Sequence, residues 1–128
     1  MKPGMEIGQK ATITAEVTPE MYARFEGKTV HPAYSTVSMV YHMEWAARQI
    51  ILPYLEEHEE GIGGAVSARH IAPTPAGETI EATATLTDLK GNTVITAVEV
   101  RNSKGIIGKG EVTQFILPKK QIAKKLSG

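Results

Sequence analysis

The feature that most constrains the fold is a long helical stretch, rich in apolar side chains, near the middle of the chain. It has the sequence Thr36-Val-Ser-Met-Val-Tyr-His-Met-Glu-Trp-Ala-Ala-Arg-Gln-Ile-Ile-Leu52, and Pro53 ends or kinks it. At about 3.6 residues per turn, apolar side chains cover nearly the whole circumference of this helix. Such a helix is predicted to be buried and not merely to rest on a surface. The remaining elements must therefore enclose it.

The sequence after Gly61 predicts β-strands. Apolar and polar residues alternate with a period of two over 79–87. Tight turns are expected at 90–92 and 102–105, and glycines 108 and 110 predict a bulge or a close backbone contact. The expected strands are 63–70, 79–87, 94–100 and 106–117, joined as an antiparallel meander, with an earlier strand at 10–17. A buried helix and such a sheet predict an α+β fold with the sheet wrapped around the helix.

The other segments are expected to be short or solvated. Thr18-Pro19 predicts the start of a short helix, because the hydroxyl can cap it and proline suits its first turn. Residues 31–35 are expected to form a loop into the main helix, and 56–60 a solvated exit from it. Residues 1–117 are predicted to be a single domain. The basic tail 118–128 is expected to be frayed and solvated.

Composition narrows the class of protein. The chain has 128 residues, 41% hydrophobic and 22% charged, which is typical of a folded globular domain. Its formal net charge is zero, so no nucleic-acid or anionic-membrane partner is expected. The absence of cysteine excludes disulfides, a cysteine nucleophile and a Cys-ligated zinc site. With no apolar leader or span-length apolar run, we expect a cytoplasmic protein.

Three polar residues in apolar surroundings are the candidate catalytic groups. Thr36 opens the long helix, Glu44 lies in its middle, and His70 ends the strand 63–70. A carboxylate in a buried helix is costly unless it is paired, and low-dielectric surroundings raise its pKa. Glu44 could therefore attack a carbonyl or activate water, with His70 as proton carrier. On a straight helix Thr36 and Glu44 lie about a quarter-turn apart and could line one pocket wall.

Each of these residues also has a structural explanation. His70 could be a satisfied histidine at the end of a sheet, and Glu44 could pair with Arg48 one turn later. Thr36 could simply cap the helix, a role that Ser35 or Ser38 could also fill. A capping role is compatible with catalysis, because the start of a helix also presents backbone N–H groups to a developing oxyanion.

Two glycines and three other histidines complete the candidates. Gly63 and Gly64 enter the strand of His70, where they permit a bulge or the close approach of a substrate. His31, His42 and His58 have no ligand partners at matched spacing, so no metal site is predicted.

The sequence also carries a resemblance. The segments Met39-Val-Tyr-His-Met-Glu-Trp-Ala46, Pro53-Tyr-Leu55, Gly63–His70 and Thr74-Pro-Ala-Gly77 resemble the hotdog-fold thioesterases, in particular the fluoroacetyl-CoA thioesterase-like group. The similarity covers roughly residues 1–117. Thr36, Glu44 and His70 match the positions of that group's catalytic threonine, glutamate and histidine.

The resemblance implies an acyl-CoA thioesterase that acts as a homodimer, with active sites at the subunit interface. Glu44 would be the nucleophile or the water-activating base, Thr36 would orient it and hold the thioester oxygen, and His70 would be the general acid/base. No cofactor is implied, because CoA is part of the substrate.

The segment 25–34 is shorter and poorer in phenylalanine than in the fluoroacetyl-CoA enzyme. We therefore expect a small or medium acyl group without fluoroacetyl selectivity. A hotdog enoyl-CoA hydratase-type lyase and a non-catalytic acyl-CoA-binding module are the alternatives. No ligands for the CoA phosphates are assigned. Solvated surface charge is the default interpretation of Arg69, Arg101, Lys104 and Lys109.

Overall fold

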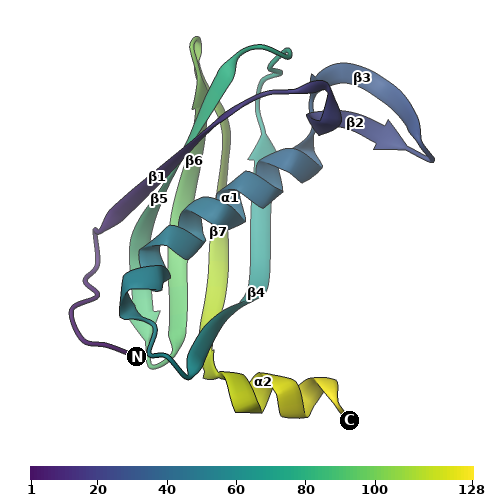
Figure 1. The fold of residues 1–128 in the computed structure, drawn as a ribbon. Coiled ribbons are helices and arrows are strands. Elements are labelled where there is room, and N and C mark those ends of the chain that lie inside the picture. The colour runs from purple at the N-terminus through teal and green to yellow at the C-terminus, as the bar shows by residue number, and fades with distance from the viewer.

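A five-stranded antiparallel sheet curves across one long helix, α1 (Thr36–Ile51), in the computed structural model, which describes residues 1–128 (Figure 1). This is the α+β arrangement predicted from the sequence. The strands of the sheet are β1 (Lys10–Glu16), β4 (Glu59–His70), β5 (Thr79–Lys90), β6 (Thr93–Asn102) and β7 (Gly105–Pro118). The short helices are η1 (Pro19–Met21) and η2 (Leu52–Tyr54), which are 3-10 turns, and α2 (Lys119–Leu126).

The strand order is β1-β5-β6-β7-β4, and every pairing is antiparallel. Strands β5, β6 and β7 form the expected meander. The prediction of a four-strand meander was wrong, because β4 crosses to the far side and pairs with β7 instead of β5. This crossing makes β4 an edge strand.

Helix α1 buries one face and exposes the other, which corrects the prediction that it is buried all round. The buried face packs on the sheet and consists of Met39, His42, Met43, Ala46, Ala47, Ile50 and Ile51. On the opposite face, Val37 is 78% exposed, Tyr41 65% and Trp45 40%. The outer face of α1 therefore exposes a patch of apolar side chains.

The segment expected to be a loop before α1 is part of a β-hairpin. Strands β2 (Tyr22–Phe25) and β3 (Lys28–Tyr34) pair with each other and project from the sheet at the N-terminal end of α1 (Figure 1). Their two-residue turn has positive φ angles, 54° at Glu26 and 78° at Gly27, as hairpins with this turn length require. The segment expected to be a linker is therefore a β-hairpin beside the start of the helix.

Two glycines of β7 let the helix approach the sheet. A Cβ on Gly108 would collide with the Met39 sulfur, and one on Gly110 would collide with the Ser67 carbonyl oxygen and the Met43 methyl group. The register between β6 and β7 also shifts next to Gly108. The bulge and the close contact expected from these glycines are therefore both present.

The C-terminal tail is helical in the structure, whereas the sequence analysis expected it to be frayed. Its helix α2 follows Pro118 without a side-chain cap, and its residues are exposed except for the half-buried Ile122. It lies at the end of the sheet away from the β2–β3 hairpin (Figure 1). No helix in the structure combines the length and the apolar character needed to cross a membrane.

Candidate active site

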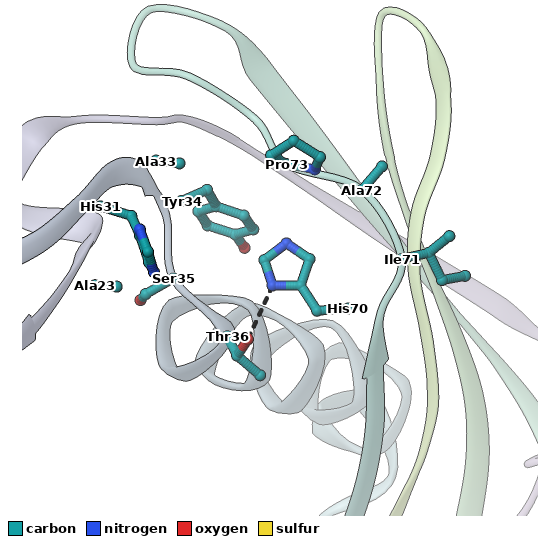
Figure 2. A pocket seen from close by; sticks show the side chains of 10 residues that line it. All are labelled: Ala23, His31, Ala33, Tyr34, Ser35, Thr36, His70, Ile71, Ala72 and Pro73. Carbon is teal, nitrogen blue, oxygen red and sulfur yellow. Dashed lines mark hydrogen bonds between the residues drawn. The ribbon is translucent and has the colours of Figure 1, made fainter.

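Thr36 and His70 meet where the start of α1 faces the end of β4. The Thr36 hydroxyl Oγ1 lies 2.9 Å from Nδ1 of His70, a hydrogen bond in either tautomer of the ring (Figure 2). Thr36 is free for this contact because the capping role belongs to its neighbour: Ser35 Oγ accepts a hydrogen bond from the Ser38 backbone N–H at 3.0 Å. The alternative of Thr36 as the helix cap is therefore wrong.

The second nitrogen of His70 is left without a partner. Its Nε2 is buried and makes no hydrogen bond. It is the one buried side-chain nitrogen or oxygen in the structure that lacks a hydrogen-bond partner. Burial lowers the pKa of the His70 imidazole, and the Ala72 backbone acts in the opposite direction more weakly. A ring held at one nitrogen, with the other unsatisfied, is suited to exchange a proton with a bound molecule.

An open cleft of about 520 Å³ surrounds this pair. The β2–β3 hairpin supplies one wall and the segment after β4 supplies another (Figure 2). The lining residues are Ala23, His31, Ala33, Tyr34, Ser35, Thr36, His70, Ile71, Ala72 and Pro73. Small apolar side chains around one hydrogen-bonded polar pair are typical of a site for a small organic ligand.

Glu44 lies in a different pocket of the same chain. Its pocket has a volume of about 270 Å³ and is lined by Tyr41, Glu44, Trp45, Arg48, Gly61, Gly63, Val112 and Gln114. Glu44 is exposed, which differs from the expected burial in the helix. Its structural alternative also fails: Arg48 binds Glu60 at 2.8 Å and has no ion pair with Glu44. The structure therefore brings Thr36 and His70 together but keeps Glu44 apart from them within one chain.

Gly63 and Gly64 form the β-bulge that the sequence analysis considered. The β4–β7 register shifts between Gly63 and Ala65, so Gly64 is the extra residue. A Cβ on Gly64 would collide with the Phe115 ring, whereas one on Gly63 would lie 3.9 Å from the Glu44 carboxylate. The bulge therefore sets the backbone of β4 against the pocket of Glu44.

Sequence reasoning missed a buried polar pair behind the cleft. The Tyr34 hydroxyl lies 2.6 Å from Nδ1 of His42, and both residues are buried. The signal was the position of His42 in the helix: it lies three residues after Met39 and four before Ala46, on the buried face. No group of three or more His, Cys, Asp or Glu side chains in the structure could hold a metal ion.

Known proteins with related sequences and folds share this architecture. Residues 17–120 match the model of the family described as fluoroacetyl-CoA-specific thioesterase. The chain is 33% identical over 116 residues to the fluoroacetyl-CoA thioesterase of Streptantibioticus cattleyicolor, covering 86% of this chain and 84% of that enzyme.

Two solved structures extend the comparison. A hypothetical protein of the thioesterase superfamily from Thermus thermophilus superimposes with a TM-score of 0.95 at 45% identity, covering 99% of this chain and 93% of that one. A threonine-to-serine variant of the fluoroacetyl-CoA thioesterase, in complex with acetyl-CoA, superimposes with a TM-score of 0.89 at 26% identity, covering 96% and 97%.

The fold and the matches define the class: this is a hotdog-fold thioesterase, a thioester hydrolase. Within that class, the chain belongs to the fluoroacetyl-CoA-specific thioesterase family.

Proposed function

We propose that this protein hydrolyses a small or medium acyl-CoA thioester to the free acid and CoA, with Thr36, Glu44 and His70 as its catalytic set. The observation that carries the proposal is the hydrogen bond between Thr36 Oγ1 and His70 Nδ1, with Nε2 buried and unsatisfied beside an open cleft. The acetyl-CoA complex of a relative supports an acyl-CoA as the ligand. Phe25 is 70% exposed and lines a second pocket beside Thr36, not the cleft of His70; the basis for proposing a substrate other than fluoroacetyl-CoA is the short, phenylalanine-poor segment 25–34.

In the proposed reaction, a C–O bond to the acyl carbon forms and the C–S bond to CoA breaks. Glu44 removes a proton from the attacking water, or it attacks the carbonyl carbon directly to form a mixed anhydride that water then hydrolyses to the free acid. In the tautomer with its proton on Nδ1, His70 donates to Thr36 Oγ1, which leaves the Thr36 hydroxyl proton free for the thioester oxygen as negative charge develops there. Nε2 of His70 is then the free basic nitrogen: it receives the proton released by the attacking water, directly or through Glu44, and passes it to the departing thiolate. Burial, which lowers the pKa of His70, keeps the resting imidazole neutral at pH 7.

The separation of Glu44 from His70 supports a site shared between two chains. Glu44 faces Gly63, and six residues of β4 lie between Gly63 and His70; because Gly64 is bulged out, the strand advances by six steps, about 20 Å at 3.3 Å per residue. A side chain cannot span that distance. Strand β4 has one free edge, and Ile62 and Val66 expose apolar side chains along it.

A second copy could pair with that edge, antiparallel and centred between Val66 and Ser67. Gly63 of one copy would then lie opposite His70 of the other, which brings Glu44 of the partner copy toward Thr36 and His70. The same contact would cover the exposed face of Tyr41 and Trp45. We therefore propose a homodimer in which each active site takes Glu44 from one copy and Thr36 with His70 from the other. Gly63 and Gly64 are proposed to present backbone to the substrate at this interface.

The first experiment measures thiol release from acyl-CoAs running from acetyl to palmitoyl, for the parent, Glu44→Gln and His70→Ala. We expect turnover of short or medium chains by the parent and a loss of at least about 100-fold in each variant. Parent-level rates in both folded variants would contradict the catalytic assignment. Addition of water to a crotonyl thioester without thiol release would indicate a lyase instead, and preference for palmitoyl-CoA would contradict the proposed substrate class.

A mixing experiment tests the shared site. Glu44→Gln and His70→Ala chains are unfolded together, refolded as an equal mixture and assayed. If Glu44 acts across the interface, half of the dimers are mixed and each has one intact site, so about a quarter of the parent rate returns. If Glu44 acts within its own chain, no site is intact and the mixture stays inactive.

A further inference from the structure

The buried pair Tyr34 and His42 lies directly behind the Thr36–His70 cleft. The 2.6 Å separation of the Tyr34 hydroxyl and His42 Nδ1 is short for a hydrogen bond between neutral groups. Tyr34 is 2% exposed and His42 3%. Burial raises the pKa of the Tyr34 phenol and lowers the pKa of His42, so both groups are neutral; in the tautomer with the His42 proton on Nε2, the phenol donates to Nδ1.

Tyr34 connects this pair to the catalytic histidine. Its ring stands against the His70 ring in an edge-to-face arrangement, with 6.1 Å between the ring centroids and an interplanar angle of 77°. Figure 2 shows the Tyr34 ring beside the His70 ring, in the same cleft as Thr36. Tyr34 is therefore both a wall of the cleft and a direct neighbour of the histidine.

The backbone fixes the other end of Tyr34. Its N–H donates to the Thr74 carbonyl at 2.8 Å, and the next N–H, of Ser35, donates to the Met21 carbonyl at 2.8 Å. The side chain is thus held at its backbone by these bonds and at its hydroxyl by His42. A ring fixed at both ends cannot slide or tilt away from His70 without breaking a hydrogen bond.

His42 extends the same contacts to the other pocket. Its ring stacks on Tyr34 at 5.7 Å, and it meets Tyr41 at 5.4 Å and Trp45 at 6.2 Å. Tyr41 and Trp45 line the pocket of Glu44. One continuous series of ring contacts therefore joins the pocket of Glu44 to the cleft of His70 within the same chain.

We propose that the Tyr34–His42 hydrogen bond positions the His70 imidazole for proton transfer, acting on the ring from the side while Thr36 holds Nδ1. The proposal rests on the proposed function, since it assigns positioning residues to that site. A buried polar pair carries a possible cost in stability, because the loss of either partner leaves the other without a hydrogen bond. Two apolar side chains of similar shape could pack in the same space without that cost. They would make no hydrogen bond, however, so the ring at position 34 would be held only at its backbone end.

Four variants separate positioning from simple packing. Tyr34→Phe removes the donor and keeps the ring. His42→Leu removes the acceptor, whereas His42→Asn keeps an acceptor near the place of Nδ1. Tyr54→Phe is the matched control: its hydroxyl also makes side-chain hydrogen bonds, to Gln9 at 3.0 and 3.3 Å, but at the opposite end of α1.

Two measurements are made on each protein: kcat and KM for the best acyl-CoA, and the tautomer and pKa of His70 by nitrogen NMR of the imidazole. For Tyr34→Phe and His42→Leu we expect kcat to fall by about 10-fold with KM changed less than about twofold, because only proton transfer is misaligned. The His70 nitrogen shifts should move in both proteins. His42→Asn and Tyr54→Phe should resemble the parent in all of these measurements.

The proposal is overturned if Tyr34→Phe keeps the parent kcat and the parent His70 spectrum, even where its thermal stability falls. It is also overturned if the double variant Tyr34→Phe/His42→Leu recovers stability and rate together, since the pair would then contribute packing alone. If His42→Leu does not fold, Tyr34→Phe decides. If the parent hydrolyses no thioester, the proposed function fails, yet the His70 spectra still decide whether Tyr34 and His42 set the state of that ring.

Discussion

Replacing Thr36 with valine removes the single hydrogen bond that holds the His70 ring. Valine has nearly the shape of threonine, so the change deletes the hydroxyl and little else. Because Nε2 has no partner, the His70 side chain of this variant would make no hydrogen bond at all. The helix start should survive, because Ser35 and not Thr36 caps it. The variant therefore separates the chemistry of the site from the stability of the fold.

The size of the effect follows from the geometry. A hydrogen bond of 2.9 Å at an exposed position contributes about 0.5–1.5 kcal/mol, which corresponds to a loss of roughly 2- to 13-fold if it acts only in the transition state. Misorientation of the unrestrained imidazole adds to this and can bring the total toward about 100-fold. We expect kcat/KM to fall by about 10- to 100-fold, while the free energy of unfolding changes by less than about 0.5 kcal/mol.

The assay compares thiol release and urea unfolding of Thr36→Val with two controls. Thr83→Val removes a hydroxyl that also makes a 2.9 Å bond, to Thr12 on the sheet, and should leave the rate unchanged. Ser35→Ala removes the helix cap and should lower the free energy of unfolding by about 1 kcal/mol. If Thr36→Val retains kcat/KM within twofold of the parent, or loses activity only in proportion to its stability, the assigned role of Thr36 is wrong.

Three further predictions concern stability and assembly. Burial lowers the pKa of His42 and His70, so below pH 6.5 the unfolded chain binds more protons than the folded chain. The free energy of unfolding should therefore be highest above pH 6.5 and should decline as the pH falls through the pKa values of the two histidines in the folded protein. Urea unfolding of the parent and of His42→Asn between pH 8 and 5 should show a smaller decline in the variant. Gly110→Ala should lose about 3 kcal/mol by denaturant unfolding because its Cβ meets the Ser67 carbonyl, whereas Gly63→Ala, which meets nothing closer than 3.9 Å, should stay within about 0.5 kcal/mol. Val66→Lys on the free edge of β4 should yield monomers in sedimentation experiments, and a dimer of parent affinity would contradict the proposed pairing.

The sequence predicted most of the secondary structure because its signals were local. Alternation over 79–87 gave β5, and the turns at 90–92 and 102–105 gave the meander that follows. The position of β4 was not predictable in this way. Its hydrogen bonds go to β7, about fifty residues later in the chain, and nothing in the pattern of 63–70 distinguishes an edge next to β7 from one next to β5.

The β2–β3 hairpin was missed because its strongest signal is one turn. Glu26-Gly27 adopts positive φ at both residues, which glutamate rarely does, and Pro32 argued against a strand. The pairing is tolerated because β2 and β3 form a separate two-stranded sheet, where a proline removes no bond from the main sheet. The tail 118–128 was expected to fray because it is short and basic, yet a helix forms after Pro118.

The sequence singled out Thr36, Glu44 and His70 as candidates, but it did not predict how they lie relative to one another. Thr36 and His70 were grouped with Glu44 by the resemblance, and the structure places the first two in contact. Glu44 was placed on the same helix and assumed to share their pocket, since rotation along a helix can be calculated from spacing. The distance along β4 between Gly63, which lies beside Glu44, and His70 could not be related to the helix, because it depends on which strand β4 pairs with and in what register.

The exposed face of α1 follows from the same geometry. A helix that is apolar nearly all round was predicted to be enclosed, yet the five strands of one chain cover only the side containing Met39 and Met43. The sheet ends at β4, so Tyr41 and Trp45 remain uncovered. Glu44 lies between these two aromatic residues in sequence and shares their pocket, so whatever covers them also surrounds its carboxylate. An apolar pattern around nearly the whole helix is therefore what we expect if the proposed dimer covers its outer face. On this proposal, Glu44 is exposed in a single chain and becomes buried only when two chains associate. Dissociating the dimer by Val66→Lys should accordingly abolish hydrolysis without unfolding the protein.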